Sequence, residues 1–243
     1  MTNLNLSNQF ILNPGEISFS DLDRIMKKIT KHNVDYADFY FQYSKNEFWS
    51  IEDGSVKNGS YSIDQGVGIR SVSGEKSAFT YSDDISINSL DEACKIINSI
   101  KNQGQSKSVP LNSEKKRKLL YSTSNPLESL DNLSKIRLLE DIEQEAKSLD
   151  SRIKKVSASL VAQYEIILIK NFNGQLIEDV RPLVRLSINV IAEFNGKREQ
   201  GSSGGGGRYN LDYFTKGILN EYASAAVNQA LTNLDAVASP AGS

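Results

Sequence analysis

The chain has 243 residues, with 28 lysines and arginines, 30 aspartates and glutamates, one histidine and one cysteine. A hydrophobic fraction of 39% and a charged fraction of 24% are typical of a folded globular protein and exclude a disordered or collagen-like chain. The net charge of −2 gives no electrostatic basis for binding nucleic acid, and a single histidine excludes histidine-rich metal cages and two-histidine acid–base catalysis.

The first half of the chain predicts a helix, a run of short strands and a second helix. Apolar residues at helical spacing predict the first helix over 18–31, capped by Ser20 or Asp21. From Asp35 the hydrophobic period changes to two, which predicts a strand rich in aromatic residues. Further strands are expected over 47–52, 56–63, 67–72 and 77–81, separated by turns at Asp53-Gly54, Asn58-Gly59, Gln65-Gly66 and Ser73-Gly74. The second helix is expected over 86–100, followed by a polar loop over 102–124.

The second half repeats this order. A helix is predicted over 130–149, with an apolar stripe of Leu133, Ile136, Leu139, Ile142 and Ala146. Strands are expected over 153–170, 175–180 and 183–194, with Pro182 ending the second of them. Residues 197–203 are expected to pair back, before a glycine-rich loop and a closing helix over 213–236.

The predicted fold class is α+β, with helices on one face of an antiparallel sheet and the order helix–strands–helix occurring twice. The connections between strands are too short for the crossover helices that parallel strands need. The chain is accordingly divided into an N-terminal helix region (1–35), a first segment of strands then helix (36–104), a polar linker (105–128) and a second segment of helix, strands, glycine-rich loop and helix (129–243).

The most unusual segment is the glycine run Gly204, Gly205, Gly206 and Gly207, followed by Arg208. Glycines let backbone N–H groups approach a ligand, and Arg208 adds a positive charge for a phosphate or carboxylate. No Lys-Ser or Lys-Thr follows, so the run is not a P-loop. A ligand or peptide contact and a flexible linker therefore both stay open.

Other candidates have structural alternatives. Two glycines in a strand context precede Arg70, so Asp64 and Arg70 belong either to an interface or to a plain hairpin. Arg181 is expected in a structural salt bridge. His32 is expected to cap a helix end and Cys94 to lie in the core. The residue pattern predicts no catalytic residue and no metal ligand.

Several long segments resemble the TldD/PmbA metalloprotease family, and in particular its TldD branch. They are Tyr36–Gln42, Ile51–Tyr61, Ile63–Arg70 with Ser73–Lys76, Asp179–Ser187, Gly196–Arg208 and Asn233–Gly242. The resemblance implies a cytoplasmic, zinc-dependent peptidase of small or unfolded peptides that pairs with a PmbA/TldE-like partner subunit or with itself. No membrane partner is expected, because no apolar run approaches the roughly 18–20 residues of a membrane span.

In that family the zinc ligands come from a HExxxH motif and a late cysteine in the C-terminal half. This chain stops at Ser243, before the motif is expected to begin, so the resemblance assigns zinc to the family and none to this chain. The expected role is that of the N-terminal substrate-chamber half, with Gly204 to Arg208 nearest the peptide. The alternatives are a non-catalytic peptide-binding or assembly module left by truncation, and an anion-binding protein built around the glycine run.

Overall fold

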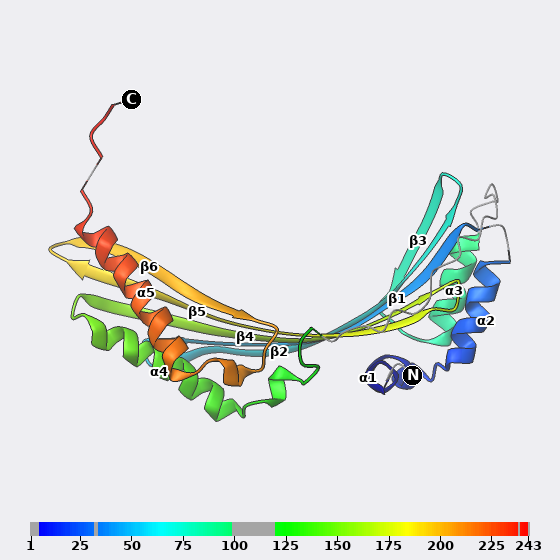
Figure 1. Cartoon of the computed structure of the whole chain (residues 1–243), viewed down its shortest axis with the longest axis horizontal. Helices are drawn as coiled ribbons and strands as arrows, with labels where there is room; N and C mark the ends of the chain where they lie inside the picture. The colour runs from blue at the N-terminus through cyan, green and yellow to red at the C-terminus, as the bar shows by residue number, and fades with distance from the viewer. Residues whose placement is uncertain (1–4, 32–33, 99–119, 238, 243) are drawn as a thin grey trace. The chain divides into compact units, whose positions relative to one another are not determined.

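The computed structural model describes residues 5–31, 34–98, 120–237 and 239–242. These residues form two compact units, each assembled from three separate stretches of the chain. The first unit contains residues 1–45, 63–120 and 165–181, and the second contains 46–62, 121–164 and 182–243. A six-stranded sheet in the order β3-β2-β1-β4-β5-β6 contributes strands to both units (Figure 1).

The order of the elements confirms the predicted repeat of helix, strands and helix. After α1 (Asn5–Ser7), the first set is α2 (Phe19–Ile29), β1 (Tyr36–Glu52), β2 (Ser55–Ser73), β3 (Lys76–Ser82) and α3 (Ile87–Asn98). The second set is α4 (Asn132–Leu149), β4 (Ile153–Asn171), β5 (Leu176–Phe194), β6 (Lys197–Gly207) and α5 (Lys216–Asp235). Strands β2 and β3, and likewise β5 and β6, pair antiparallel as predicted.

Two hairpin turns follow directly from the sequence. Asp53 and Gly54 join β1 to β2 with φ angles of 48° and 75°, and Asn195 and Gly196 join β5 to β6 with φ angles of 49° and 79°. Positive φ at both central residues matches the right-handed twist of the flanking strands, and Asp-Gly and Asn-Gly adopt it at low cost.

In the first unit, helices α2 and α3 lie together on one face of the strands (Figure 1). The strand residues on that face are buried and mainly apolar, as the alternation along β1 shows: Ala37, Phe39, Phe41 and Tyr43 are buried. Helix α2 buries Leu22, Ile25, Met26 and Ile29 against them. The residues between them on β1 point to the other face, where the described part of this unit has no helix.

In the second unit, α5 packs on β6 and against α4. Burial alternates along β5, so one face of this strand is covered, with Leu186, Ile188 and Val190 fully buried. The helix approaches β6 closely because small residues meet there. A Cβ atom on Gly201 would collide with the backbone of Ala226 and Ala230.

Four predicted strand breaks are wrong, and one of them is the break before 47–52, because the aromatic-rich strand and 47–52 form the single strand β1. The strands continue through Asn58-Gly59 and Gln65-Gly66 in β2 and through Pro182 in β5. The ring of Trp49, a residue of the neighbouring strand β1, covers Gly59. This segment of β2 therefore continues alongside β1 and stays extended. Pro182 lies beyond the end of β6, whose pairing reaches Val184 opposite Gly207, so its missing N–H costs no bond to that strand.

Two predictions about helices are also wrong. The N-cap of α2 is Ser18, which forms a reciprocal capping box with Asp21, and not Ser20 or Asp21. In α4, Leu133 is 67% exposed, whereas Lys135 and Glu143 are buried in its place. The cap of α4 is Asp131, which accepts a hydrogen bond of 2.7 Å from the backbone N–H of Ser134.

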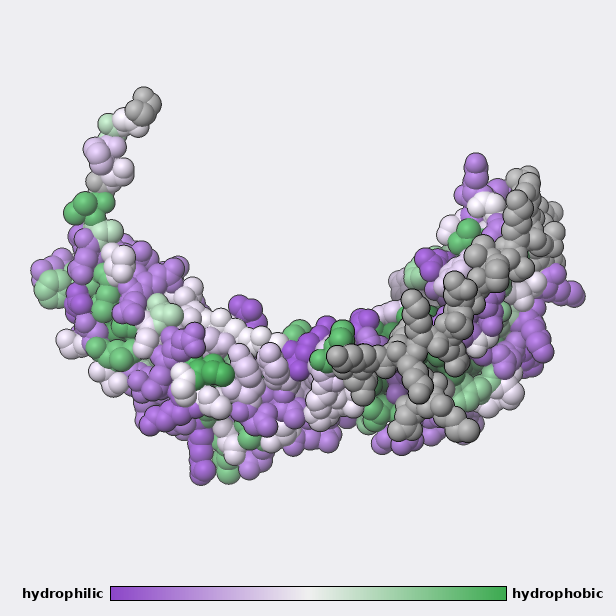
Figure 2. All heavy atoms as spheres, in the orientation of Figure 1, coloured by the Kyte–Doolittle hydropathy of each residue, from purple (hydrophilic) through white to green (hydrophobic). Residues whose placement is uncertain are grey.

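The predicted polar linker lies mostly outside the described residues, which exclude 99–119. Its described end contains a short 3-10 turn, Pro126–Glu128, before α4. Within the residues that the structure describes, no helix is both long and apolar enough to cross a membrane. Polar side chains dominate the visible surface of both units, interrupted by smaller apolar patches (Figure 2).

Candidate functional site

The glycine run is the last part of strand β6, and not the loop that the sequence predicted. Gly204 to Gly207 pair antiparallel with Ser187 to Val184 of β5. Strand β6 is the outermost strand on its side of the sheet, so in the described part of the chain no strand lies along one edge of the run. A strand edge made of glycines is a row of backbone groups without side chains between them.

Packing within the second unit also requires glycine here. Gly204 and Gly206 have φ angles of 150° and 158°, which residues with a side chain rarely adopt. A Cβ atom on either residue would collide with a backbone carbonyl oxygen of β5, that of Leu186 or that of Val184. The fold therefore explains the run before any ligand is considered.

Side chains of α5 cover the first part of the β6 edge. The backbone N–H of Ser202 donates to the side-chain oxygen of Gln229 at 2.7 Å, and the carbonyl oxygen of Gln200 accepts from Asn233 at 3.1 Å. Gly204 and Gly206 follow at the same two-residue spacing, so their backbone groups are expected to face the same edge. Among the described residues, no side chain bonds to the backbone of these two glycines.

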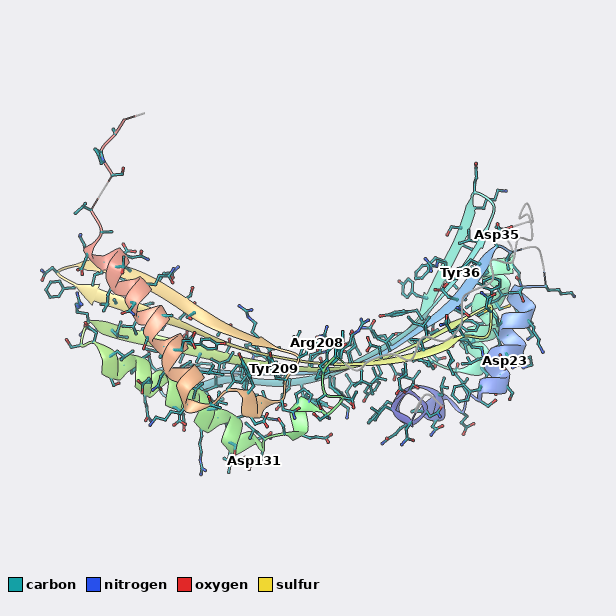
Figure 3. All side chains as sticks on the ribbon, viewed as in Figure 1. Asp23, Asp35, Tyr36, Asp131, Arg208 and Tyr209 are labelled. Carbon is teal, nitrogen blue, oxygen red and sulfur yellow. The ribbon has the colours of Figure 1, made fainter. Side chains whose placement is uncertain are left out.

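Arg208 lies directly after this edge, with Tyr209 beside it (Figure 3). Its guanidinium donates to the carbonyl oxygen of Pro182 at 3.3 Å and stands over the ring of Tyr121, 5.3 Å from the centroid. Tyr209 stacks on Tyr213 with ring centroids 4.3 Å apart. Arg208 is exposed, so its charge is accessible to a ligand at the end of the strand.

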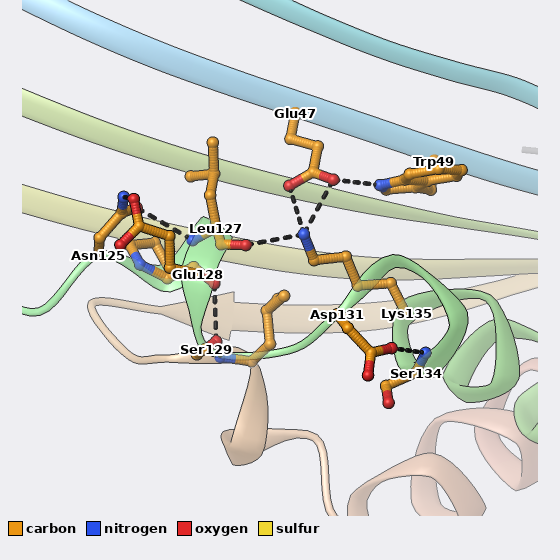
Figure 4. A network of polar contacts seen from close by, with 11 residues as sticks. Glu47, Trp49, Asn125, Leu127, Glu128, Ser129, Asp131, Ser134 and Lys135 are labelled. Atoms are coloured by element: carbon orange, nitrogen blue, oxygen red, sulfur yellow. Dashed lines mark hydrogen bonds and ion pairs between the residues drawn. The ribbon is translucent and has the colours of Figure 1, made fainter.

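A buried ion pair fixes the start of α4 to the sheet of the second unit (Figure 4). The ammonium group of Lys135 contacts both carboxylate oxygens of Glu47, at 2.9 and 2.7 Å, and the carbonyl oxygen of Leu127 at 2.8 Å. The indole N–H of Trp49 donates to the same carboxylate. Sequence reasoning missed this cluster, although Lys135 lies three, four and seven residues before the buried Leu138, Leu139 and Ile142.

The other predicted site residues lie in the first unit. Arg70 of β2 donates two hydrogen bonds of 3.0 Å to the carboxylate of Asp38 on β1. Arg181 of β5 bonds to Asp179 at 2.6 Å and lies 3.7 Å from Glu165 of β4. Asp64 is exposed on β2. The carboxylates of Asp38 and Asp179 raise the pKa of Arg70 and of Arg181, respectively.

The lone cysteine lies in the core of the first unit, as predicted. His32 lies outside the described residues. Cys94 is buried, and burial raises the pKa of its thiol, which disfavours the reactive thiolate. Within the described ranges, no three histidine, cysteine, aspartate or glutamate side chains are grouped so that they could hold a metal ion.

Comparison with known protein families matches the chain in two places. Residues 37–100 match the model of PmbA/TldA metallopeptidase domain 1, and residues 125–234 match that of the PmbA/TldA metallopeptidase central domain. A curated relative, the metalloprotease TldD homolog of Haemophilus influenzae, is 45% identical over 246 residues, covering 98% of this chain and 51% of that protein. The chain spans about half the length of the curated relatives that it matches.

Solved structures share the fold. A Thermotoga maritima protein has a TM-score of 0.74 at 16% identity, covering 92% of this chain and 50% of that chain. TldE from Thermococcus kodakarensis has a TM-score of 0.64 at 14% identity, covering 87% of this chain and 47% of that chain. At these identities the likeness bears on the fold alone, whereas the two family models together match most of the chain. The chain therefore belongs to the PmbA/TldD metallopeptidase family, over its first and central domains.

Proposed function

We propose that this chain is the substrate-chamber part of a TldD-type metallopeptidase acting on small or unfolded peptides, and that Gly204 to Arg208 contact the peptide backbone. The observation that carries the proposal is the bare edge of β6 at Gly204 and Gly206. An extended peptide bonds to such an edge through its main chain, and side-chain-free residues let it approach without a clash. Recognition of this kind selects for an unfolded backbone rather than for a particular sequence.

Arg208 completes the proposed site at the end of the strand. Its exposed guanidinium offers a charged hydrogen-bond donor to a peptide carboxylate. Its contacts with Pro182 and Tyr121 hold it at the end of the edge. The neighbouring α5 side chains Gln229 and Asn233 limit the edge on the other side, because they already bond to the backbone at Ser202 and Gln200.

The proposal gives this chain a binding role and gives its described residues no role in holding zinc, since they do not group into a metal site. The proposed partner is a PmbA/TldE-like subunit, which the fold likeness to TldE supports. The proposed compartment is the cytoplasm, where a buried thiol such as Cys94 stays reduced.

Two forms of one unfolded peptide test the edge. We expect a fluorescent ten-residue peptide to bind the chain in an anisotropy titration, and a copy N-methylated at every residue, which has no hydrogen-bonding edge, to bind much more weakly. Each lost main-chain hydrogen bond is worth roughly 0.5–1.5 kcal/mol, so three lost bonds weaken binding by about tenfold or more. Equal affinity of the two peptides would contradict main-chain recognition.

Photocrosslinking locates the site. A benzoylphenylalanine in place of Tyr209, beside the edge, is expected to crosslink to the unmethylated peptide. The same group in place of Phe194 serves as the matched control, because Phe194 is similarly exposed (53% against 49%) but lies at the far end of β5. Crosslinking at position 194 alone would place the peptide elsewhere. Arg208→Ala is expected to weaken binding several-fold, and Arg198→Ala, near the other end of β6, is not.

A further inference from the structure

Three tyrosines of the second unit gather beside the glycine run, and main-chain recognition at the β6 edge gives them no role. Tyr222 belongs to α5, Tyr213 ends the 3-10 turn before this helix, and Tyr209 follows Arg208 at the end of β6 (Figure 3). We call Tyr209, Tyr213 and Tyr222 the tyrosine cluster. Its contacts with the strand suggest what kind of side chain a bound peptide carries.

The cluster lies on the helix-covered face of β6. Alternate residues of a strand share a face, so Gly205 and Gly207 point to the same side as Gly201, which lies against α5. A Cβ atom on Gly205 would collide with the hydroxyl oxygen of Tyr222, and one on Gly207 would lie 2.6 Å from the ring of Tyr209. These two glycines therefore make room for tyrosine rings directly on the backbone of the run.

Tyr222 approaches the strand from the same stripe of α5 that covers the first part of the β6 edge. Gln229 and Asn233, which bond to the backbone of Ser202 and Gln200, follow Tyr222 by seven and eleven residues. At 3.6 residues per turn, both spacings bring a side chain back to within about 20° of the same direction. Along this stripe, α5 presents amides to the first part of the edge and a phenol ring to the glycine run.

Contacts within the cluster hold the rings in place. Tyr209 stacks on Tyr213 with an interplanar angle of 8°, and Tyr213 packs edge-on against the buried ring of Phe214. Burial and a hydrogen bond with Tyr213 raise the pKa of the Tyr222 hydroxyl, so this phenol is uncharged at neutral pH. Tyr209 is nevertheless 49% exposed. The cluster therefore offers an uncharged and preorganised aromatic surface beside the edge.

We propose that the tyrosine cluster makes the β6 site selective for unfolded segments with aromatic side chains at every second position, an inference that rests on the proposed peptide binding at β6. A peptide extended along the edge directs alternate side chains towards the α5 side. There an aromatic side chain stacks on the rings, whereas a polar one loses water without gaining a partner. The main chain then supplies affinity and the cluster supplies specificity. The three tyrosines select the peptide and take no part in its chemistry.

Two peptides of one length measure this selectivity. The probes are fluorescein-labelled ten-residue peptides in which phenylalanine or glutamine alternates with serine. On the full chain, we expect anisotropy titrations to give a dissociation constant about five- to thirtyfold lower for the phenylalanine peptide, from two aromatic contacts. N-methylation at every residue is expected to weaken the binding of both peptides, because the main chain still provides most of the affinity.

Variants of the cluster are compared by the ratio of the two dissociation constants. Tyr209→Ala and Tyr222→Ala are each expected to lower this ratio several-fold, and Tyr222→Phe, which keeps the ring, is expected to preserve it. Phe79→Ala with Tyr81→Ala is the matched control, because these rings are 66% and 80% exposed but belong to the first unit. Urea midpoints identify any variant that does not fold, and the exposed position of Tyr209 decides the test if Tyr222→Ala unfolds.

The outcomes separate this inference from the proposed function. If neither peptide binds, peptide binding at β6 is wrong and the selectivity falls with it. If both peptides bind equally, or if folded Tyr209→Ala keeps the parent ratio, the edge binds peptides without help from the cluster and only the inference is overturned. Loss of the preference in the Phe79 and Tyr81 double variant also overturns it, because the phenylalanines then bind in the first unit.

Discussion

Lys135 is a charged residue in the core of the second unit, where its environment decides whether it stabilises the fold. Its side chain is 3% exposed and that of Glu47 is 9% exposed. Removing two charges from water is costly, and hydrogen bonds to Leu127 and Trp49 offset part of this cost. The pair holds the turn before α4 against β1.

The pair gives a stability prediction. Lys135→Met leaves the Glu47 carboxylate buried without its cation, and we expect it to lower the free energy of unfolding by about 3–5 kcal/mol. Urea denaturation followed by circular dichroism measures the change. Lys135→Met combined with Glu47→Gln is expected to cost less than the sum of the two single changes. Additive costs would contradict direct coupling of the two side chains.

Asp150 gives a prediction on pH. Hydrogen bonds from the side chain and the backbone N–H of Arg152 lower the pKa of Asp150 from 3.8 to about 2. Since the pKa is lower in the folded state, the stabilisation is present above pH 4 and is lost as the pH falls towards 2. Asp150→Asn is therefore expected to be less stable than the parent at pH 6, and the difference should shrink between about pH 4 and 2. A difference that grows in acid would contradict this.

At the scale of single elements, the residue that caps the start of α2 differs between the structure and the sequence prediction. The Ser18 side chain accepts from the backbone N–H of Asp21 at 3.2 Å, and the Asp21 carboxylate accepts from the backbone N–H of Ser18 at 3.1 Å. We expect Ser18→Ala to cost about 1 kcal/mol and Ser20→Ala much less, as measured by urea denaturation. A larger loss of stability in Ser20→Ala than in Ser18→Ala would mean that Ser20 is the cap.

The contact between α5 and β6 depends on one small residue. Because a Cβ atom on Gly201 would collide with the backbone of α5, Gly201→Ala is expected to destabilise the chain by about 1–3 kcal/mol. Ser202→Ala is the control, since Ser202 is exposed and bonds to Gln229 through its backbone. Thermal unfolding compares the two variants, and equal midpoints would mean that α5 can move away at no cost.

Elements were predictable where local chemistry agrees with long-range pairing. Asp53-Gly54 and Asn195-Gly196 form the expected turns, since both central residues of each adopt the positive φ that this type of turn needs. Asn58-Gly59 has the same turn chemistry and stays extended, because its segment lies beneath Trp49. The glycine run was expected to be a loop for a similar reason. Its pairing with β5 and its fit against α5 cannot be recognised from composition.

Site residues were predictable only in part. The sequence singled out Arg70 and Arg181 but not the carboxylates that they contact, Asp38 and Glu165. Asp38 lies 32 residues before Arg70 in the chain, and Glu165 lies on a different strand from Arg181. Only the register of the sheet brings each carboxylate to its arginine. Lys135 was missed because the predicted apolar stripe of this helix contained no charged residue, whereas the structure buries its side chain.

At the scale of the molecule, the two units are interleaved along the chain. The segment matched as domain 1, residues 37–100, contributes to both units, and so does the central-domain match. The first unit needs residues 165–181 of β4 and β5 in addition to 1–45 and 63–120. No single stretch of sequence therefore contains a complete unit.

Fragments test this interleaving. A fragment of residues 1–120 lacks the β4 and β5 segments of the first unit, so we expect it to unfold without cooperativity in urea. Mixing it with a fragment of residues 121–243 is expected to restore a cooperative transition. Cooperative unfolding of residues 1–120 alone would mean that β1 to β3 with their helices are self-sufficient.

The packing of the glycine run affects how variation among relatives is to be interpreted. Gly204 and Gly206 are needed by β5 and Gly201 by α5, so selection for stability alone would keep them unchanged. Their invariance in distant homologues would not identify a substrate contact. Arg208 is exposed and occupies no such tight position, so invariance there would record selection for function. A relative that no longer binds substrate is expected to keep these glycines but to carry other residues at position 208.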